Sequence, residues 1–212
     1  MDTSLVSPDE RPVAIAILAK APLAGLAKTR LAPELGPDGA AALQARFIER
    51  TVDTARRAAT GPITLWAAPD RDHPVFQTLS ALLGVQLQKQ PEGDLGQRML
   101  IALGDSPTLV IGTDCPTLTA DHLRAAADVL RSGVDAVVIP VEDGGYALIG
   151  TNRPQPKLFA DMTWGTAAVM TETRRRLTRL GLTWREPARL WDVDTVADLE
   201  RMRSEGLASL MG

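Results

Sequence analysis

The chain has 212 residues, of which 45% are hydrophobic and 23% charged. These values are typical of a globular protein and argue against disorder, fibrous repeats and coiled coil. Lys and Arg total 23, and Asp and Glu total 26, so the chain lacks the basic excess typical of nucleic-acid-binding proteins. With one cysteine and two histidines, an internal disulfide is excluded and a structural zinc site is disfavoured. A metal would therefore need carboxylate ligands, which favours Mg²⁺ or Mn²⁺.

The ends of the chain differ in character from its middle. Residues 1–12 are acidic where a signal peptide would be basic, and the apolar run 13–19 is too short to span a membrane. A lone thiol suits a reducing compartment, so we expect a cytoplasmic protein that does not contact membranes. We predict a mobile N-terminal tail over 1–12, a single domain over 13–204 and a C-terminal tail over 205–212.

Short apolar runs alternate with helical patterns along the chain. The predicted strands span 13–18, 63–68, 84–89, 108–112, 134–141 and 146–150, with short strands near 182–185 and 189–192. The predicted helices span 38–59, 95–103, 119–131, the stretch from 166 to about 180, and a last helix from 195. This alternation predicts an α/β fold with a mostly parallel central sheet and helices on both faces. Ligands of such sheets bind beyond the carboxyl ends of the strands.

The first strand is followed by a loop with three cations, Lys20, Lys28 and Arg30, together with Gly25 and Thr29. Glycine lets backbone N–H groups approach an anion closely, and the cations neutralise phosphate charge. The pattern is neither a Walker A loop nor GxGxxG. A phosphate site is favoured over a merely solvated basic loop because the loop directly follows a buried strand.

A second loop, PEGDLG, follows the third strand and contains Gly93 and Asp94. The Asp94 carboxylate could accept a hydrogen bond from a purine amino group. It could equally cap the following helix, and the two roles are compatible.

Acidic side chains follow two further strands. Asp114 directly follows the buried strand 108–112, where a carboxylate is a natural Mg²⁺ ligand, although it could also form a turn. Asp192 and Asp194 lie one residue apart before the last helix. One of them could join Asp114 on a metal ion, or Asp194 or Thr195 could simply cap the helix.

Two segments are candidates for binding an acceptor molecule. The segment EDGGY at 142–146 lies between two apolar runs and could also form a plain hairpin turn. The segment WGT at 164–166 precedes a helix, so Thr166 could cap that helix or help to bind an anion. The arginine run 174–176 is interpreted as a solvated helix face, because adjacent helical residues point in different directions.

Six of these segments, taken in order, resemble the bacterial DUF2064 group of GT-A-like transferases in the nucleotide-diphospho-sugar transferase superfamily. They are AKAPLAGLAKTRLAPELG, GDLGQRM, IGTDCPTL, EDGGYALIG, WGT and DVDTVADLE, and they extend from Ala19 to Glu200. The segment KTRL is also similar to 2-phospho-L-lactate guanylyltransferases and, more loosely, the chain is similar to molybdenum-cofactor guanylyltransferases. The glycosyltransferase Asp-x-Asp pattern is absent, since Cys115 and Pro116 follow Asp114.

The resemblance implies a Rossmann-like GT-A fold and assigns a role to each motif. The residues that it implies for nucleotide binding, together with those proposed from the loops above, are Lys20, Gly25, Lys28, Thr29, Arg30, Gly93 and Asp94. The implied acceptor-binding residues are Asp143, Gly144, Gly145, Tyr146, Trp164, Gly165 and Thr166. Asp114 and Asp194 would bind Mg²⁺ or Mn²⁺, and together with Lys28 they are the expected catalytic residues.

The combined pattern predicts a nucleotide-binding transferase. The first hypothesis is metal-dependent transfer of a nucleotidyl group from a nucleoside triphosphate to a small anionic acceptor, with release of pyrophosphate. Lys28 and Arg30 would neutralise the β- and γ-phosphates, and Lys20 would lie nearer the α-phosphate. Two alternatives are a GT-A glycosyltransferase that uses a nucleotide sugar and a catalytically silent nucleotide-binding protein.

Overall fold

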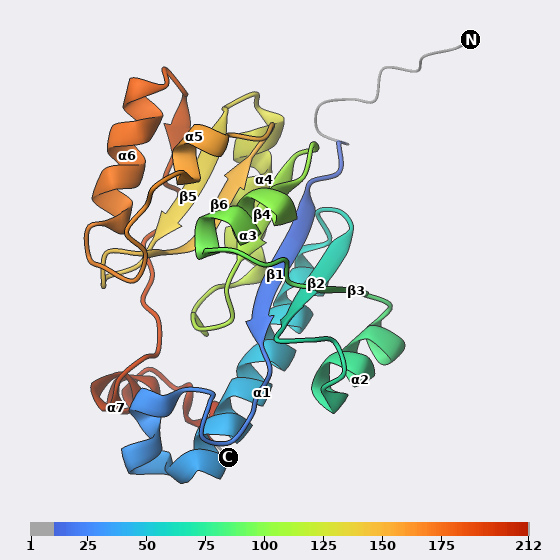
Figure 1. The fold of residues 1–212 in the computed structure, drawn as a ribbon, viewed down its shortest axis with the longest axis vertical. Helices are drawn as coiled ribbons and strands as arrows, with labels where there is room; N and C mark the ends of the chain where they lie inside the picture. Colours follow the sequence, from blue (N-terminus) through green and yellow to red (C-terminus); the bar gives the residue numbers. More distant parts are fainter. Residues whose placement is uncertain (1–10, 212) are drawn as a thin grey trace.

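The computed structural model describes residues 11–211 and contains a seven-stranded sheet with the order β3-β2-β1-β4-β6-β5-β7 (Figure 1). The strands are β1 (Ala14–Lys20), β2 (Ile63–Ala68), β3 (Gln86–Lys89), β4 (Thr108–Ile111), β5 (Ala136–Pro140), β6 (Tyr146–Thr151) and β7 (Trp184–Arg185). Strands β1 to β4 pair in parallel, whereas β6 is antiparallel to both β4 and β5. The predicted mostly parallel sheet is confirmed.

Seven α-helices surround the sheet within the described part of the chain. They are α1 (Ala32–Ala58), α2 (Pro74–Leu83), α3 (Leu95–Leu103), α4 (Ala120–Arg131), α5 (Pro156–Phe159), α6 (Val169–Arg179) and α7 (Val196–Ser204). There are also two short 3-10 turns. The turn η2 (Thr29–Leu31) directly precedes α1, and the turn η3 (Ala208–Leu210) follows α7. The predicted bounds of α3 are confirmed, as is the Thr119 cap of α4. Helices α2 and α5 were not predicted.

Two layers of helices bury the two faces of the sheet. On β1 the side chains of Ile15 and Ile17 point into a core shared with α1, α2 and α4. Ala16, between them, faces a second core that contains side chains of α3, α5 and α6. This alternation is the period of two that a strand imposes, and it confirms the predicted helices on both faces (Figure 1).

A third, smaller core joins the two ends of the described chain. Phe47 of α1 packs with Leu199 of α7 and with Trp191 and Val193, which precede α7. Figure 1 shows α7 beside the first turns of α1, below the sheet. Leu210 and Met211 pack against the same core, so part of the segment predicted as a C-terminal tail contacts the domain. The predicted N-terminal tail lies outside the described residues up to position 10.

The arginine run on α6 is not uniformly solvated, which corrects the sequence interpretation. Arg174 and Arg175 are exposed, but the side chain of Arg176 is only 7% exposed. Its Nε donates to Glu172 at 2.6 Å, and its guanidinium nitrogens donate to the carbonyls of Leu158, Ala160 and Asp161. Arg176 therefore satisfies the carbonyls at the end of α5, which explains why a charged side chain is buried there.

None of the described helices combines the length and the apolar character needed to cross a membrane.

Candidate functional site

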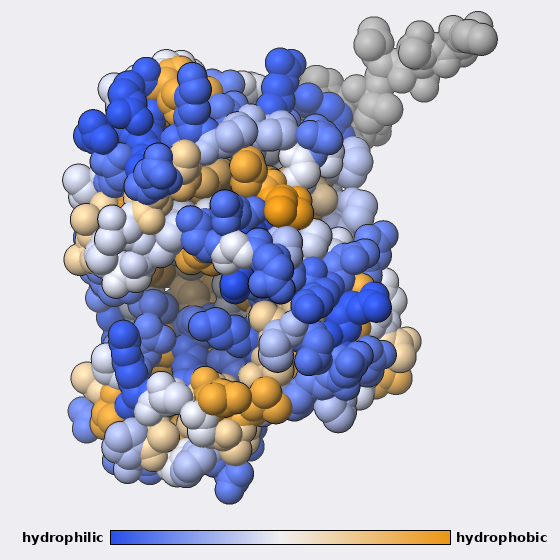
Figure 2. All heavy atoms as spheres, in the orientation of Figure 1, coloured by the Kyte–Doolittle hydropathy of each residue, from blue (hydrophilic) through white to orange (hydrophobic). Residues whose placement is uncertain are grey.

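A cleft of about 570 Å³ lies at the carboxyl ends of β1 and β4. Figure 2 shows the surface hollowed between the body of the sheet and the lower part formed by α7 and the start of α1. Its lining includes charged and polar side chains, among them Lys20, Lys28, Thr29, Arg30, Arg98, Asp114 and Asp194. It also includes the apolar or aromatic residues Leu18, Leu95, Met99, Val110, Tyr146 and Ala147. The position agrees with the rule for ligand sites in α/β sheets.

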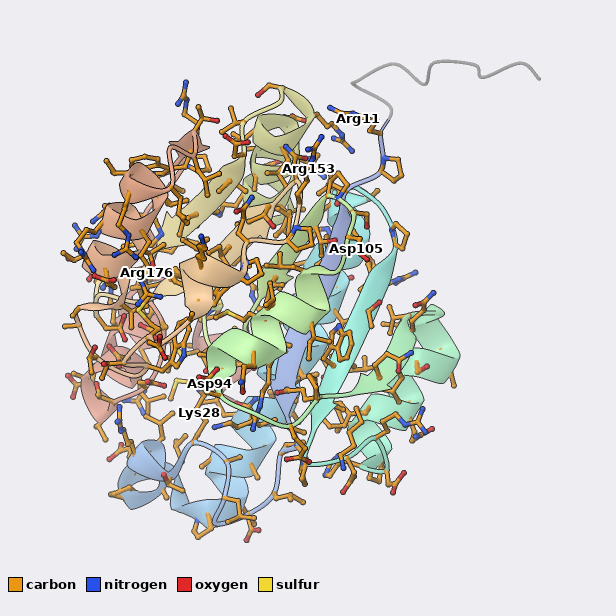
Figure 3. All side chains as sticks on the ribbon, turned by 45° about the horizontal axis from the view of Figure 1, so that its top comes forward. Arg11, Lys28, Asp94, Asp105, Arg153 and Arg176 are labelled. Atoms are coloured by element: carbon orange, nitrogen blue, oxygen red, sulfur yellow. The ribbon has the colours of Figure 1, made fainter. Side chains whose placement is uncertain are left out.

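The loop after β1 folds so that Lys28 points into the cleft. Gly25 has φ of 77°, a conformation that favours glycine, and the backbone N–H of Ala27 donates to the carbonyl of Leu23 at 2.9 Å. Lys28 itself adopts the left-handed conformation, with φ of 47°. The turn η2 then leads directly into α1, and Figure 3 shows Lys28 at this junction.

Lys28 brings the two acids of the predicted metal site together. Its Nζ lies 2.6 Å from Asp114 Oδ1 and 3.3 Å from Asp194 Oδ1. It also donates to the carbonyl of Val193 at 2.7 Å, and it lies over the ring of Phe47, 5.6 Å from the centroid. The three predicted catalytic residues, Lys28, Asp114 and Asp194, are thus direct neighbours, although Asp114 lies 86 positions and Asp194 lies 166 positions after Lys28 in the sequence.

Backbone contacts hold the segment that contains Asp194 against the end of β4. The Val193 N–H donates to the Asp114 carbonyl at 2.9 Å, and Cys115 Sγ donates to the Trp191 carbonyl at 3.1 Å. Burial raises the pKa of the Cys115 thiol, which fits a structural thiol rather than a nucleophile. Asp198 accepts from the backbone N–H groups of Asp194 and Thr195 at 3.0 and 2.7 Å, so the start of α7 fixes the position of Asp194.

A divalent cation fits this donor set. Lys28 Nζ occupies a point on which carboxylate oxygens of Asp114 and Asp194 converge, so a positive charge is already accommodated there. Both carboxylates are partly exposed, at 50% and 42%. Among the described residues, no group of three or more His, Cys, Asp or Glu side chains could hold a metal ion. Mg²⁺ bound with substrate phosphates commonly uses one or two carboxylates and several waters, so two acids are sufficient.

The Asp192 carboxylate is close enough to Asp114, Asp194 and Asp143 to feel their charges. Burial, followed by the charges of Asp143, Asp194 and Asp114, raises the pKa of Asp192 to about 6. The sequence alone left open which acid of the pair Asp192 and Asp194 would join Asp114, and the family resemblance selected Asp194. The concentration of negative charge around the cleft favours binding of a cation.

The loop predicted to contact a nucleobase is organised around the start of α3. Asp94 Oδ1 accepts from the Gln97 N–H at 2.8 Å, and Gln97 Oε1 accepts from the Asp94 N–H at 3.0 Å. These contacts form a capping box, which is the second of the two roles weighed for Asp94. Gly93 has φ of 111°, and a Cβ there would lie 2.1 Å from Gln97 Oε1, so the glycine permits the cap.

The predicted acceptor residues divide between the cleft and its support. Tyr146 lines the cleft, and its ring meets the ring of Trp164 edge to face, with centroids 6.5 Å apart. Burial raises the pKa of the Tyr146 phenol, whose hydroxyl donates to Met99 Sδ at 3.8 Å. Trp164 packs against α3, since a Cβ on Gly96 would lie 2.8 Å from its ring. Trp164 therefore supports the wall that Tyr146 presents.

The glycines of the EDGGY segment form a turn rather than a lining of the main cleft. Asp143 Oδ1 accepts from the Gly145 N–H at 2.8 Å, and Gly144 accepts from the Met170 N–H at 2.8 Å. Gly144 lines a different cavity, of about 450 Å³. In the WGT segment, Gly165 has φ of 73°, and Thr166 donates to the Thr163 carbonyl at 3.0 Å. Thr166 does not cap α6, whose capping residue is Ala168.

The Gly144→Ala variant is expected to be less stable than wild type by about 2–6 kcal/mol, because strain and overpacking each contribute about 1–3 kcal/mol. Gly144 has φ of 94°, and its Cβ would lie 2.2 Å from the Ala167 carbonyl oxygen. Gly165→Ala is the matched control, with φ of 73° and nothing within 4 Å, so strain alone acts there. Urea unfolding measures both. Equal losses of unfolding free energy in the two variants would show that the close contact with Ala167 does not destabilise Gly144→Ala.

Sequence reasoning missed three side chains that line the cleft. Gln44 of α1 donates to Thr113 Oγ1 at 3.0 Å. Gln90 is buried after β3, and its Nε2 donates to the carbonyls of Ala19 and Trp66, each at 3.0 Å. Arg98 of α3 lines the cleft and an adjoining cavity of about 370 Å³. Gln90 directly follows a strand, and this position could have indicated that it lines the cleft. Gln44 and Arg98 lie on helices, where no sequence pattern indicated that they face the cleft.

The comparisons with known proteins agree with this architecture. The profile of a family described as an uncharacterized protein conserved in bacteria (DUF2064) matches residues 51–166. No curated protein matches the chain significantly. A solved structure from Desulfovibrio desulfuricans, described as a candidate nucleotide-diphospho-sugar transferase, is similar with a TM-score of 0.80 and 26% identity, over 94% of this chain and 96% of that one.

Two more distant structures share the fold. CMP:2-keto-3-deoxy-manno-octonic acid synthetase in complex with CTP has a TM-score of 0.57 at 13% identity, over 94% of this chain and 100% of that one. Glucosyl-3-phosphoglycerate synthase from Mycobacterium tuberculosis, in complex with Mn²⁺, UDP and glucosyl-3-phosphoglycerate, has a TM-score of 0.55 at 11% identity, over 97% and 81% of the two chains. These likenesses confirm the GT-A-like fold that the motifs predict.

Proposed function

The chain belongs to the DUF2064 family, and from this premise we propose that it transfers a nucleotidyl group from a nucleoside triphosphate to a small anionic acceptor. The observation that carries the proposal is the convergence of Lys28, Asp114 and Asp194 in one cleft, with Nζ–O distances of 2.6 and 3.3 Å. Cationic groups for phosphate and a carboxylate pair for a divalent cation are the two requirements of phosphoryl-group chemistry.

The cationic side chains of the cleft are assigned to the triphosphate. Lys20 ends β1 and is exposed at the cleft, and the Arg30 side chain is 76% exposed, so both can reach a bound anion. Lys28 supplies a third cation beside them. These groups neutralise the phosphates and orient the α-phosphorus, and no nucleophilic side chain is required.

The carboxylate pair is assigned to Mg²⁺ or Mn²⁺. When bound, such an ion polarises phosphate oxygens and offsets charge that develops during transfer. Asp114 and Asp194 hold their positions for it through the contacts between the segment at 191–194 and the end of β4. In the reaction, an acceptor oxygen forms a bond to the α-phosphorus, and the bond from that phosphorus to pyrophosphate breaks.

The acceptor is assigned to the side of the cleft that Tyr146 lines. Tyr146 follows the turn made by Asp143 and its glycines, and Trp164 supports its ring. A glycosyltransferase that uses a nucleotide sugar is the second candidate, favoured by the description of the structure that is 26% identical to this chain. The single acid after β4, followed by Cys115, supports nucleotidyl transfer as the first.

A thermal-shift panel tests nucleotide binding directly. We expect one or more nucleoside triphosphates to stabilise the protein with Mg²⁺ or Mn²⁺, by about 2.7 kcal/mol at a ligand concentration of 100 Kd. The nucleoside of the same base should stabilise it far less, because it lacks the phosphates that the cationic loop binds. A flat response to triphosphates and nucleotide sugars would contradict both enzyme candidates.

Product analysis separates the two reactions. With a panel of phosphorylated and carboxylated hydroxy compounds as acceptors, release of pyrophosphate from a triphosphate supports nucleotidyl transfer. Release of a nucleoside diphosphate from a nucleotide sugar supports glycosyl transfer instead. Binding without turnover of either donor would favour a silent nucleotide-binding protein.

A further inference from the structure

The ammonium group of Lys28 is engaged by three partners and is almost buried. It contacts Asp114 Oδ1 at 2.6 Å, Asp194 Oδ1 at 3.3 Å and the Val193 carbonyl at 2.7 Å. Two of its three donors are used by Asp194 and the Val193 carbonyl, and the Asp114 carboxylate forms an ion pair with it. The side chain is 6% exposed, and the face of Phe47 lies below it. Because the ammonium is buried among these partners, a phosphate can bind Lys28 only if the ammonium moves away from at least one of them.

The same contacts occupy the proposed cation site. Asp114 and Asp194 each direct an oxygen to Lys28 Nζ, so a divalent ion between them would compete with a positive charge already in place. Arg30 is different, since it lies 3.7 Å from the other oxygen of Asp194 and its side chain is 76% exposed. It can move into solvent without leaving the carboxylates unpaired.

We propose that Lys28 acts as an internal cation that closes the Asp114–Asp194 pair, so that a divalent ion binds tightly only when a phosphate group draws the ammonium away. The inference rests on the proposed assignment of the carboxylates to a metal ion. It makes Lys28 the link between two binding events. Phosphate binding removes a competitor from the metal site, and metal binding frees Lys28 for phosphate. Such coupling is reciprocal, because each ligand changes the affinity of the other by the same factor.

The backbone around Lys28 provides the means for this exchange. Lys28 has φ of 47° and ψ of 43°, and the preceding residues Ala24, Gly25 and Leu26 are exposed. This exposed part of the loop can shift while the buried Ala27 stays packed. Asp114 and Asp194, in contrast, are held by backbone hydrogen bonds. The Asp114 carbonyl accepts from the Val193 N–H, and the Asp194 N–H donates to Asp198. The lysine is therefore the group that moves.

A Mn²⁺ titration of the nucleotide-free protein tests the inference. Lys28→Met keeps the aliphatic stem over Phe47 and removes the charge, and it is expected to bind Mn²⁺ about 5- to 150-fold more tightly than wild type, the usual range for coupled sites. Lys157→Met, at an exposed lysine of α5 that does not line the cleft, is the matched control and should bind Mn²⁺ with nearly the wild-type affinity. Electron paramagnetic resonance of free Mn²⁺ gives the affinities, and Lys28→Gln repeats the test if Lys28→Met folds poorly.

Two results would overturn the inference. One is Mn²⁺ affinity in the folded Lys28 variants that is no higher than in wild type, including the case in which none of the proteins binds Mn²⁺. The other is a gain in Mn²⁺ affinity in Lys28→Met that persists when Asp114→Asn is added to that variant. Because the titration contains no nucleotide, its outcome is independent of the triphosphate panel. Failure of that panel would contradict the proposed function, while the metal titration would still decide the role of Lys28.

Discussion

The Asp114→Asn variant is expected to lose the divalent-cation-dependent part of nucleotide binding. Asparagine preserves the shape of the side chain but removes the charge that a cation requires. Even residues that only support metal ligands change metal affinity by 10- to 100-fold when mutated, so we expect a loss of at least about 100-fold in the affinity for the Mn²⁺–nucleotide complex. Because Asp114 is 50% exposed and Lys28 keeps Asp194 and the Val193 carbonyl as partners, stability should change by no more than about 1 kcal/mol.

Asp105→Asn is the matched control for this experiment. Asp105 is an exposed acid that precedes β4, whereas Asp114 follows it, and Figure 3 shows Asp105 far from Lys28. Calorimetric titration with and without Mn²⁺ measures the difference between the variants, using whichever triphosphate the thermal-shift panel identifies. Unchanged Mn²⁺ dependence in Asp114→Asn would remove Asp114 from the metal site.

Arg176→Met is expected to lower the free energy of unfolding by about 3–5 kcal/mol, the range for breaking a buried ion pair. The guanidinium of Arg176 donates hydrogen bonds to the carbonyls of Leu158, Ala160 and Asp161 and to the Glu172 carboxylate. Methionine retains the apolar stem but leaves these buried carbonyls without their donor, which adds a desolvation penalty. The consequence for the fold is a loosened contact between α5 and α6.

The neighbouring residue provides a matched control. Arg175 makes a bidentate pair with the same Glu172, at 2.7 and 2.9 Å, but its side chain is 61% exposed. Arg175→Met should therefore lower the free energy of unfolding by about 1 kcal/mol or less. Urea unfolding followed by circular dichroism compares the two variants. Similar losses in both would mean that the ion pair with Glu172, and not the satisfied carbonyls, carries the contribution of Arg176.

The fold was largely predictable because its strands are buried and its helices are marked at their ends. Strand β2 and helix α3 have the predicted bounds. Helix α2 was missed although His73 and Pro74 mark its start, because its short apolar pattern merged with the loop between two strands. At α1, the helix was predicted from residue 38, and the structure adds a preceding turn that Gly36 separates from the main helix.

The candidate site was predictable where a polar residue follows a strand and unpredictable where a helix contributes. Asp114 illustrates the first case, since its strand is an unbroken apolar run. Gln44 and Arg98 illustrate the second, because helical spacing does not reveal which polar side chain faces a cleft. The burial of Arg176 depends on the carbonyls at the end of α5, a contact between separate segments that no local pattern specifies.

The junction between Asp114 and the segment 191–194 makes the proposed site depend on the order in which the chain is synthesised. Strands β1 to β4 and the cationic loop precede residue 115, but Asp194 is added 80 residues later. It reaches Asp114 only when α7 packs against α1. A nascent chain could thus form most of the sheet without a complete carboxylate pair. Completion of the pair is linked to docking of the last helix, and a ligand that bridges both acids would favour the docked state by mass action.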